Sequence, residues 1–447
     1  MVGQKAKLVI AVFAAILIVF LIVGTSYLVV PDNDAITKPQ RFTNSYNMYS
    51  VTDLSRIIID STGSVYPHNA PIQEAGDTYL VTGDIINQTI EIQKDGVFID
   101  GSGHVLLGNI EGNLMGAQGL YINNRSNITV ANLHIDKFWR GIVVQNSSDI
   151  TFRDNTLTNI GSVAIMLDSC KQAEIVKNNL NNISTAIDIT SSYNIVAQNI
   201  VIAENTLINA GFGFQIGSGC ANLISKNDFI YVDNPIWVAS NSTVISNNTL
   251  VDGISGIGIG GKYLVGDTYH SGGSDCTILG NKLKNFTEAG IYVNIGVNNT
   301  IAENTIADSG YGFGFNIGGD GTGLWPVENN RIYLNDFLNN TQDTFLGEPL
   351  YVNQWDNGYQ GNYWDKFKGI DNNNDGISDI SYTIQANHID HYPLMNRYSN
   401  SELQQVQSSQ MLAICLGIVL VIIVAIMAGV ALYIKCTSAL GKRSEFS

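Results

Sequence analysis

The sequence has 447 residues, of which 45% are hydrophobic and only 14% are charged, and its net charge is −16. A chain of this length can bury a large core, and its acidic excess argues against nucleic acid as a partner. Five scattered cysteines exclude a disulfide-rich scaffold.

Residues 8–30 form an apolar run without a charged side chain, long enough to span a bilayer as a helix. Lys5 and Lys7 precede the run, so the positive-inside rule predicts a cytoplasmic tail over residues 1–7. We interpret residues 8–30 as an uncleaved signal anchor. A cleaved signal peptide is the alternative, although the run is longer than the usual apolar core of such a peptide.

Residues 31–80 are predicted to form a stalk and an N-terminal cap. A polar stretch without pattern comes first, and strand-like runs begin at Ile57. The open end of a stack of strands exposes unpaired backbone groups, so this segment is expected to cover it.

Residues 81–345 carry a recurring motif of Asn, any residue, then Leu, Ile or Phe, whose copies lie 21 to 33 residues apart. Strands that fit such a short period cannot bury a face alone, but coils stacked about 4.8 Å apart can. The sequence therefore predicts an all-β ectodomain, a right-handed parallel β-helix (solenoid), flanked by N- and C-terminal transmembrane helices. The repeated Asn side chains are expected to form a hydrogen-bonded ladder at one turn. The predicted members are Asn155, Asn179, Asn205, Asn227, Asn248, Asn281, Asn304 and Asn335.

Ten Asn-x-Ser/Thr sequons fall in the predicted exterior and suggest a glycoprotein. A repeat rich in Asn and Thr also produces sequons by chance, so glycosylation and chance remain alternatives. The sequons begin at Asn87, Asn124, Asn127, Asn146, Asn182, Asn241, Asn247, Asn285, Asn298 and Asn339.

Two oversized repeats follow the Gly-rich stretches 256–259 and 312–315. Their extra residues are expected to leave the same turn two coils apart, and insertions in a solenoid generally mark its binding face. Aromatic rings can cover sugar faces while carboxylates accept hydroxyl hydrogen bonds, so we predict a ligand site there. The candidate ligand-binding residues are Tyr263, Asp267, Tyr269, His270, Asp320, Trp325 and Glu328.

A glycoside hydrolase at these loops would need two carboxylates held at a set separation. No spacing in the sequence identifies such a pair, and no catalytic residue is assigned. The carboxylates available on the two loops are Asp267, Asp275, Asp320 and Glu328.

A loop of Asn, Asp and Gly over residues 371–379 resembles the first nine positions of an EF-hand-type loop, which suggests calcium as a cofactor. Tyr382 stands where a bidentate Glu is expected, so weak binding is predicted. An ordinary turn made of these residue types is the alternative. The predicted ligands are Asp371, Asn373, Asp375, the backbone carbonyl of Ile377, and Asp379.

A second apolar run without a charge lies near the C-terminus, and basic residues follow it. Both tails are therefore predicted to be cytoplasmic and residues 31–410 extracellular, in a protein that spans the cell membrane twice. The C-terminal segments are a cap over 346–400, a linker over 401–410, a transmembrane helix over 411–434 and a cytoplasmic tail over 435–447.

The stretch 57–108, the Asn repeats, and the closing motifs GNYWDKFKGIDNNNDGISDISYTI and DHYPLM resemble archaeal cell-surface β-helix proteins. Their repeat, the PbH1 repeat, is shared with the NosD family, which is named for a periplasmic copper-related factor. The resemblance covers about residues 57–396 and implies a right-handed β-helix. Copper favours His, Met and Cys, but only His388 and His391 lie close together, so the sequence argues against copper.

These observations favour a non-enzymatic surface protein that binds glycans or serves a structural or adhesive role with other envelope proteins. The competing hypotheses are a carbohydrate-active enzyme (lyase, hydrolase or epimerase) on the loop face, and a NosD-like accessory factor for a membrane transporter. Fold alone does not choose between them.

Overall fold

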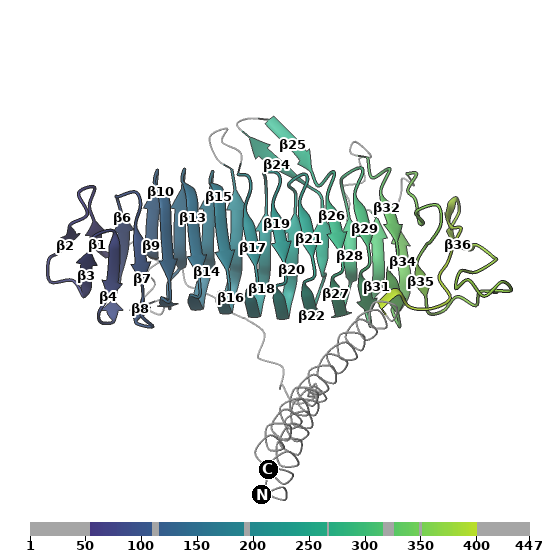
Figure 1. Cartoon of the computed structure of the whole chain (residues 1–447), viewed down its shortest axis with the longest axis horizontal. Helices are drawn as coiled ribbons and strands as arrows, with labels where there is room; N and C mark the ends of the chain where they lie inside the picture. Colours follow the sequence, from purple (N-terminus) through teal and green to yellow (C-terminus); the bar gives the residue numbers. More distant parts are fainter. Residues whose placement is uncertain are drawn as a thin grey trace, which may run out of the picture. The chain divides into compact units, whose positions relative to one another are not determined.

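The computed structural model describes residues 54–109, 116–191, 197–265, 268–315, 326–347 and 351–399. They form a right-handed, all-β solenoid of about 11 turns (Figure 1). In these ranges no helix is long and apolar enough to cross a membrane. The predicted spans, tails and linker, at 1–30 and 401–447, lie outside the described residues.

Each turn of the solenoid contributes one strand to a 12-stranded sheet, here called face B, except that the first turn contributes an antiparallel pair. The strands of face B are β3 (Ile72–Ala75), β4 (Thr78–Val81), β7 (Phe98–Asp100), β10 (Ser126–Ala131), β13 (Ser148–Arg153), β15 (Lys171–Val176), β17 (Val201–Ala203), β19 (Leu223–Ser225), β21 (Val244–Ser246), β26 (Thr277–Leu279), β29 (Thr300–Ala302) and β32 (Arg331–Tyr333).

The rest of each turn belongs to a 21-stranded sheet with two faces, A1 and A2, which follow face B in that order along the chain. The short strands β11 and β12 pair with the beginning and the end of the long strand β14, which shows that β14 runs through both faces. The strands are β1 (Ser55–Ile59), β2 (Val65–Tyr66), β5 (Ile85–Ile86), β6 (Gln88–Ile92), β8 (Val105–Leu107), β9 (Gln118–Asn123), β11 (His134–Asp136), β12 (Arg140–Gln145), β14 (Thr156–Asp168), β16 (Asn179–Thr190), β18 (Thr206–Ile216), β20 (Asp228–Val238), β22 (Thr249–Gly253), β23 (Ile257–Ile259), β27 (Lys282–Phe286), β28 (Ala289–Val293), β30 (Thr305–Ala307), β31 (Tyr311–Phe315), β33 (Asp336–Leu338), β34 (Gln342–Leu346) and β35 (Tyr363–Trp364).

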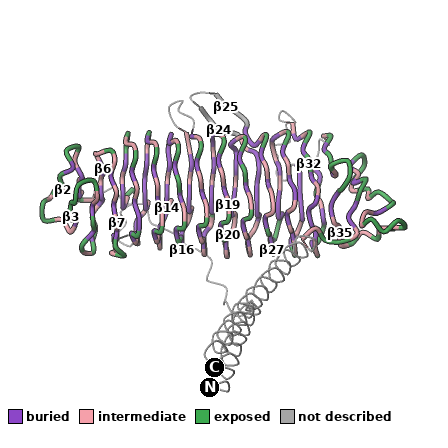
Figure 2. The backbone as a smooth tube through the Cα atoms, in the orientation of Figure 1, coloured by how far each residue is buried: buried purple, intermediate pink, exposed green. Residues whose placement is uncertain are grey.

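The core is a set of apolar columns that run along the solenoid axis. In one column Ile165 lies opposite Ile187, which lies opposite Phe214, and all three are fully buried. Buried positions recur between intermediate and exposed ones along many of the strands, as the changes of colour along the tube show in Figure 2. Each buried Ile, Leu or Phe contributes about 1.5 to 3 kcal/mol, and the three described cysteines, Cys170, Cys220 and Cys276, are free thiols.

The stacking extends further at both ends than residues 81–345. At the N-terminal end β1 already pairs in parallel with β6, and at the C-terminal end β35 pairs in parallel with β33. Strands β1 and β35 fall outside the Asn-x-Leu repeat, so the repeat alone could not reveal them. Two antiparallel hairpins stand apart from the stack, β24–β25 (Gly261–Val265, Thr268–Gly272) and β36–β37 (Tyr382–Gln385, His388–Asp390).

Candidate functional site

The repeated Asn side chains form a hydrogen-bonded ladder along the turn between faces B and A1. The Nδ2 group of Asn227 donates to Oδ1 of Asn248 at 2.9 Å, and the backbone N–H of Asn227 donates to the same oxygen. Nδ2 of Asn227 also donates to the backbone carbonyl of Ile202, so the buried amide is satisfied. The described ladder runs through Asn155, Asn178, Asn205, Asn227, Asn248, Asn281, Asn304, Asn335 and Asn362.

Asn179 is not a member of this ladder, which corrects the sequence-based assignment. Its neighbour Asn178 is buried in the ladder, whereas Asn179 is exposed at the start of β16. The spacing of Asn, any residue, then Leu is kept at this repeat, because Asn178 comes two residues before the inward Leu180. The ladder also continues to Asn362, beyond the last predicted member.

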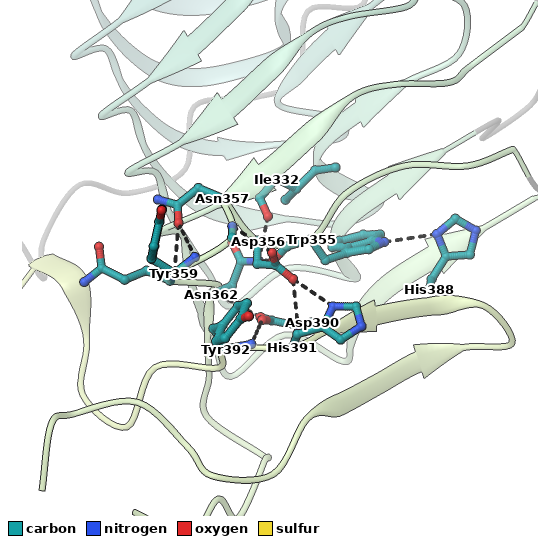
Figure 3. A network of polar contacts seen from close by, with 12 residues as sticks. Ile332, Trp355, Asp356, Asn357, Tyr359, Asn362, His388, Asp390, His391 and Tyr392 are labelled. Carbon is teal, nitrogen blue, oxygen red and sulfur yellow. Dashed lines mark hydrogen bonds and ion pairs between the residues drawn. The ribbon is translucent and has the colours of Figure 1, made fainter. Parts of the chain in front are cut away.

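The C-terminal end of the ladder is closed by Asp390, a residue that sequence reasoning missed. Its carboxylate accepts the backbone N–H of Asn362 at 2.8 Å and the indole N–H of Trp364 at 2.9 Å. Figure 3 shows this network, in which His388 Nδ1 accepts the indole N–H of Trp355. Burial raises the pKa of Asp390 to about 6 against the opposing effect of these hydrogen bonds. We therefore assign this network a structural role, which is to stabilise the C-terminal cap.

Turn geometry explains most of the sequons. Nine of the ten sequon Asn residues have φ between 49° and 64°, a region that Asn adopts more readily than other residues with a side chain. Asn182 and Asn241 are half-buried, and their amides bond to Asn159 and to the backbone N–H of Gly273. Glycosylation remains a prediction for the eight exposed Asn residues.

The two oversized repeats leave the solenoid at the same turn, between faces A2 and B. The strands that precede them, β23 and β31, are both paired with β28, so they lie two coils apart on face A2. The first insertion begins with the β24–β25 hairpin, which projects from the stack in Figure 1. The strand pairing alone therefore places the starts of both insertions at the same turn, as the sequence predicts.

Most predicted loop ligands fall where the structure does not describe side chains. Tyr263 lies opposite His270 in the hairpin backbone, and Leu264 lies opposite Tyr269. Glu328 is half-buried in the turn before β32, and its carbonyl accepts the N–H of Asn298. The remaining three candidates, which lie outside the described residues, are Asp267, Asp320 and Trp325.

A column of outward-facing side chains crosses face A2 beside these insertions. Trp237 lies opposite Gly258, which lies opposite Tyr292. Tyr292 lies opposite Gly314, which lies opposite Phe345. We call Trp237, Tyr292 and Phe345 the ring column. Sequence reasoning missed it, because these residues share a column only through the pairing register.

Glycines let the rings of this column lie across the sheet. A Cβ atom added to Gly258 would lie 2.3 Å from Cζ of Tyr292, and one added to Gly261 would lie 2.4 Å from Cζ2 of Trp237. Both rings therefore lie against backbone that has no side chain. Phe345 is 37% exposed, and its ring centroid lies 5.2 Å from that of Tyr311.

Polar atoms border the ring column. Asn294 follows Tyr292 by two residues, on the same side of the chain, and its Oδ1 is buried without a hydrogen-bond partner. Gln215 precedes Trp237 in the column and is half-buried. The arrangement places aromatic rings that can cover apolar surface beside a buried acceptor that has no hydrogen-bond partner.

The same face becomes charged toward the N-terminus. Asp188 lies two coils before Trp237 in the same column. Burial raises the pKa of Asp188, Arg140 opposes this shift and Asp168 adds to it. Nε of Arg140 is buried without a hydrogen-bond partner. Further along lies a polar hollow of about 280 Å³, lined in part by Glu91, Tyr121 and Arg125.

The expectation against copper stays a prediction, and the described histidines and cysteines are placed as follows. In the described ranges no group of three His, Cys, Asp or Glu side chains is placed to hold a metal ion. His388 uses Nδ1 to accept the indole N–H of Trp355, and His391 pairs with Asp356 at 3.0 Å. Cys170 and Cys276 are buried, and burial raises the pKa of each thiol to about 11.

In the predicted calcium loop the carboxylates bond to the loop's own backbone. Oδ1 and Oδ2 of Asp371 accept the N–H groups of Asp375 and Gly376, at 3.2 and 3.0 Å. Asp379 accepts the N–H of Asn372 at 2.8 Å. The loop is tied to the end of the cap, because the N–H of Met395 donates to the carbonyl of Gly376.

Comparison with known families finds two matches, which overlap over residues 233–271. The family described as right handed beta helix region matches residues 75–230 and 141–271. The family described as periplasmic copper-binding protein (NosD) matches residues 233–369. No curated protein sequence matches the chain.

Solved structures that are similar to this chain include the periplasmic alginate epimerase AlgG, with 14% identity and a TM-score of 0.44 over 64% of this chain and 78% of that one. A mannuronic acid specific polysaccharide family 6 lyase from human gut microbiota has 13% identity and a TM-score of 0.46, over 62% and 78% of the two chains. Alginate lyase from Paenibacillus sp. str. FPU-7 has 13% identity and a TM-score of 0.34, over 59% and 91%.

The coils described above and the two family matches agree over most of the solenoid. The chain is thus a right-handed parallel β-helix, and its residues 233–369 are similar to the family described as periplasmic copper-binding protein (NosD).

Proposed function

We propose that this protein is a non-enzymatic, membrane-anchored surface protein whose face A2 binds glycans. The observation that carries the proposal is the ring column, in which Trp237 and Tyr292 lie across glycine backbone beside the unpaired acceptor of Asn294. The anchoring part rests on the apolar runs 8–30 and 411–434.

Sugar rings present flat C–H faces bordered by hydroxyl groups. An aromatic ring covers such a face, while an amide oxygen accepts a hydroxyl hydrogen bond. Asn294 Oδ1 gains most from this arrangement, because a buried acceptor without a partner costs about 1 to 3 kcal/mol. A hydroxyl group from a ligand would remove that cost once the side chain of Asn294 turns toward solvent, because its Oδ1 is buried in this structure.

The proposal is tested by applying the full-length protein, in detergent or nanodiscs, to a glycan array. Trp237→Ala and Tyr292→Ala should each weaken binding at least about tenfold, which corresponds to about 1.4 kcal/mol. Tyr359→Ala is the matched control, because this side chain is 80% exposed on the C-terminal cap and away from the column. Equal loss in the control, or no glycan bound at all, would refute the proposal.

The same array distinguishes an enzyme from a binding protein when released sugars are also measured. Asp188 is the carboxylate that lies in line with the column, and burial raises its pKa as a catalytic acid requires. We expect no release of reducing ends. Release that disappears in Asp188→Asn would replace this proposal with a glycoside hydrolase.

A further inference from the structure

We infer that face A2 holds an uncharged, linear polysaccharide that lies parallel to the solenoid axis and contacts an aromatic ring at every second coil. The inference rests on the proposed function and specifies its ligand class. It follows from the register of the ring column, from its charge, and from its length.

The register sets the direction of the ligand. Trp237, Tyr292 and Phe345 occupy one column, and a glycine separates each from the next. Neighbouring coils are about 4.8 Å apart, so successive rings recur about every 9.6 Å along the axis. A chain laid across the strands meets all three rings, whereas a chain laid along one strand meets only one.

The glycines determine how close to the sheet the aromatic rings of the ring column lie. If Gly258 carried a side chain, its Cβ would occupy the position of the Tyr292 ring, 2.3 Å from Cζ. The ring would then have to stand away from the sheet and block a ligand that passes along the column. With glycine at this position, the ring lies low against the sheet.

The charge of the column selects the ligand class. From Gln215 to Phe345 the column positions carry no carboxylate, Lys, Arg or His side chain. The surrounding protein is acidic, with a net charge of −16, and Glu288 is close enough to add to the rise in the pKa of Tyr292 that burial causes. An acidic polysaccharide would meet repulsion without a compensating cation in the column, whereas an uncharged one would not.

The length of the column sets the size of ligand that binds best. Trp237 and Phe345 are four coils apart, which corresponds to about 19 Å. A disaccharide can contact one ring, so only a longer oligosaccharide can contact all three at once. Contacts on one rigid ligand add without a second loss of translational freedom, and affinity should therefore rise with chain length.

The test uses the full-length protein and a cello-oligosaccharide series from disaccharide to decasaccharide, with oligogalacturonides of the same lengths as the acidic comparison. Calorimetry should show affinity that rises in steps over the neutral series, by at least tenfold from the shortest to the longest member. The oligogalacturonides should bind at least tenfold more weakly than neutral chains of equal length. Phe345→Ala should lower the affinity of the longest chains and leave that of the shortest unchanged.

Two variants keep the test independent of folding. Phe345 is 37% exposed, so its removal should lower the melting temperature less than the removal of a fully buried ring, and the variant should stay folded. Gly258→Ala should displace the Tyr292 ring and weaken the binding of every length. Equal affinity for short and long chains, or preference for oligogalacturonides, would overturn this inference while the proposed function stands. Binding of a short branched glycan alone would do the same, and failure of every glycan to bind would overturn the proposed function itself.

Discussion

The backbone N–H of Asn362 donates to a carboxylate oxygen of Asp390 at 2.8 Å, and this contact ends the amide ladder of the solenoid. Every rung points the same way, because the N–H groups of each Asn donate to the Oδ1 of the next coil. The last rung therefore needs a group that only accepts, and a carboxylate is one. At the other end, the N–H of Leu133 donates to the first Oδ1, that of Asn155.

Replacing Asp390 should destabilise the C-terminal end of the solenoid. In Asp390→Ala the N–H of Asn362 and the indole of Trp364 lose their acceptor in a fully buried position. The expected loss is about 1 to 3 kcal/mol for each unsatisfied donor. Urea unfolding measures it. Glu174→Ala, at an exposed carboxylate in a strand, is the control, and equal stability of the two variants would show that Asp390 does not terminate the ladder.

The stability of the cap should also depend on pH, because burial raises the pKa values of Asp343 and Asp390 to about 6. A carboxyl group whose pKa is higher in the folded than in the unfolded state favours folding when it is protonated. Its contribution is present below the unfolded pKa, near 3.8, and is lost as the pH rises through about 6.

The melting temperature of the solenoid should therefore fall between pH 4.5 and pH 7. Lys366 lies 3.6 Å from Asp343 and opposes the shift, while Asp365 adds to it. Asp343→Asn should flatten the fall, because its amide does not titrate. A native protein with the same melting temperature at both pH values would contradict the assignment of these two groups.

The ladder itself provides a matched pair of substitutions. Asn227→Leu removes a buried rung and leaves neighbouring donors unpaired, so we expect a loss of about 1 to 3 kcal/mol. Asn179→Leu changes an exposed Asn of the same motif and should cost less than about 0.5 kcal/mol. Thermal unfolding distinguishes them, and glycan binding should be unchanged in both. Similar losses in the two variants would mean that the amide column does not carry this stability.

These residues show what the sequence alone could predict. The coils and most rungs follow from spacing, because an inward Leu or Ile recurs two residues after a buried Asn. Asn178 shows the limit of prediction from the repeat. Asn178 and Asn179 are adjacent, and only the rule that the ladder Asn comes two residues before the inward Leu180 identifies Asn178. Asp390 lies beyond the repeat, so no period points to it.

The ring column could not be predicted from the sequence, for a different reason. Trp237 and Tyr292 are 55 residues apart, 292 minus 237, in repeats of unequal length, and a one-residue slip in register would turn either ring inward. The sequence placed the predicted loop ligands only at a common turn of the solenoid. It did not determine which other side chains they lie beside. Strand pairing supplied the missing information, because it identifies which outward residues lie side by side.

The proposed topology places both tails in the cytoplasm and residues 31–410 outside. Protease applied to intact cells should digest the exterior and spare tags fused at Met1 and Ser447. Permeabilised cells serve as the control, since both tags should then be lost. Absence of the Met1 tag from the mature protein would indicate a cleaved signal peptide instead of an anchor.

The loop over residues 371–379 should bind calcium weakly and stabilise the cap when it does. Three carboxylates crowd this loop and repel one another, and a divalent cation would relieve that repulsion. In the structure, Asp371 bonds to the N–H groups of Asp375 and Gly376, which holds the turn compact with one carboxylate at its centre.

Calcium binding should reach the rest of the solenoid through the backbone. The carbonyl of Gly376 accepts the N–H of Met395, and Ser378 donates its N–H to the carbonyl of Pro393, so the loop is bonded to the segment that follows Asp390. Without Glu at position 12, the expected dissociation constant is about 10⁻⁴ to 10⁻³ M, as in extracellular modules. Melting of the full-length protein in millimolar calcium should therefore occur at a higher temperature than in chelator. Asp371→Ala should abolish the difference, whereas Glu174→Ala should not. Identical melting of the native protein in the two buffers would identify the loop as an ordinary turn held by its own hydrogen bonds.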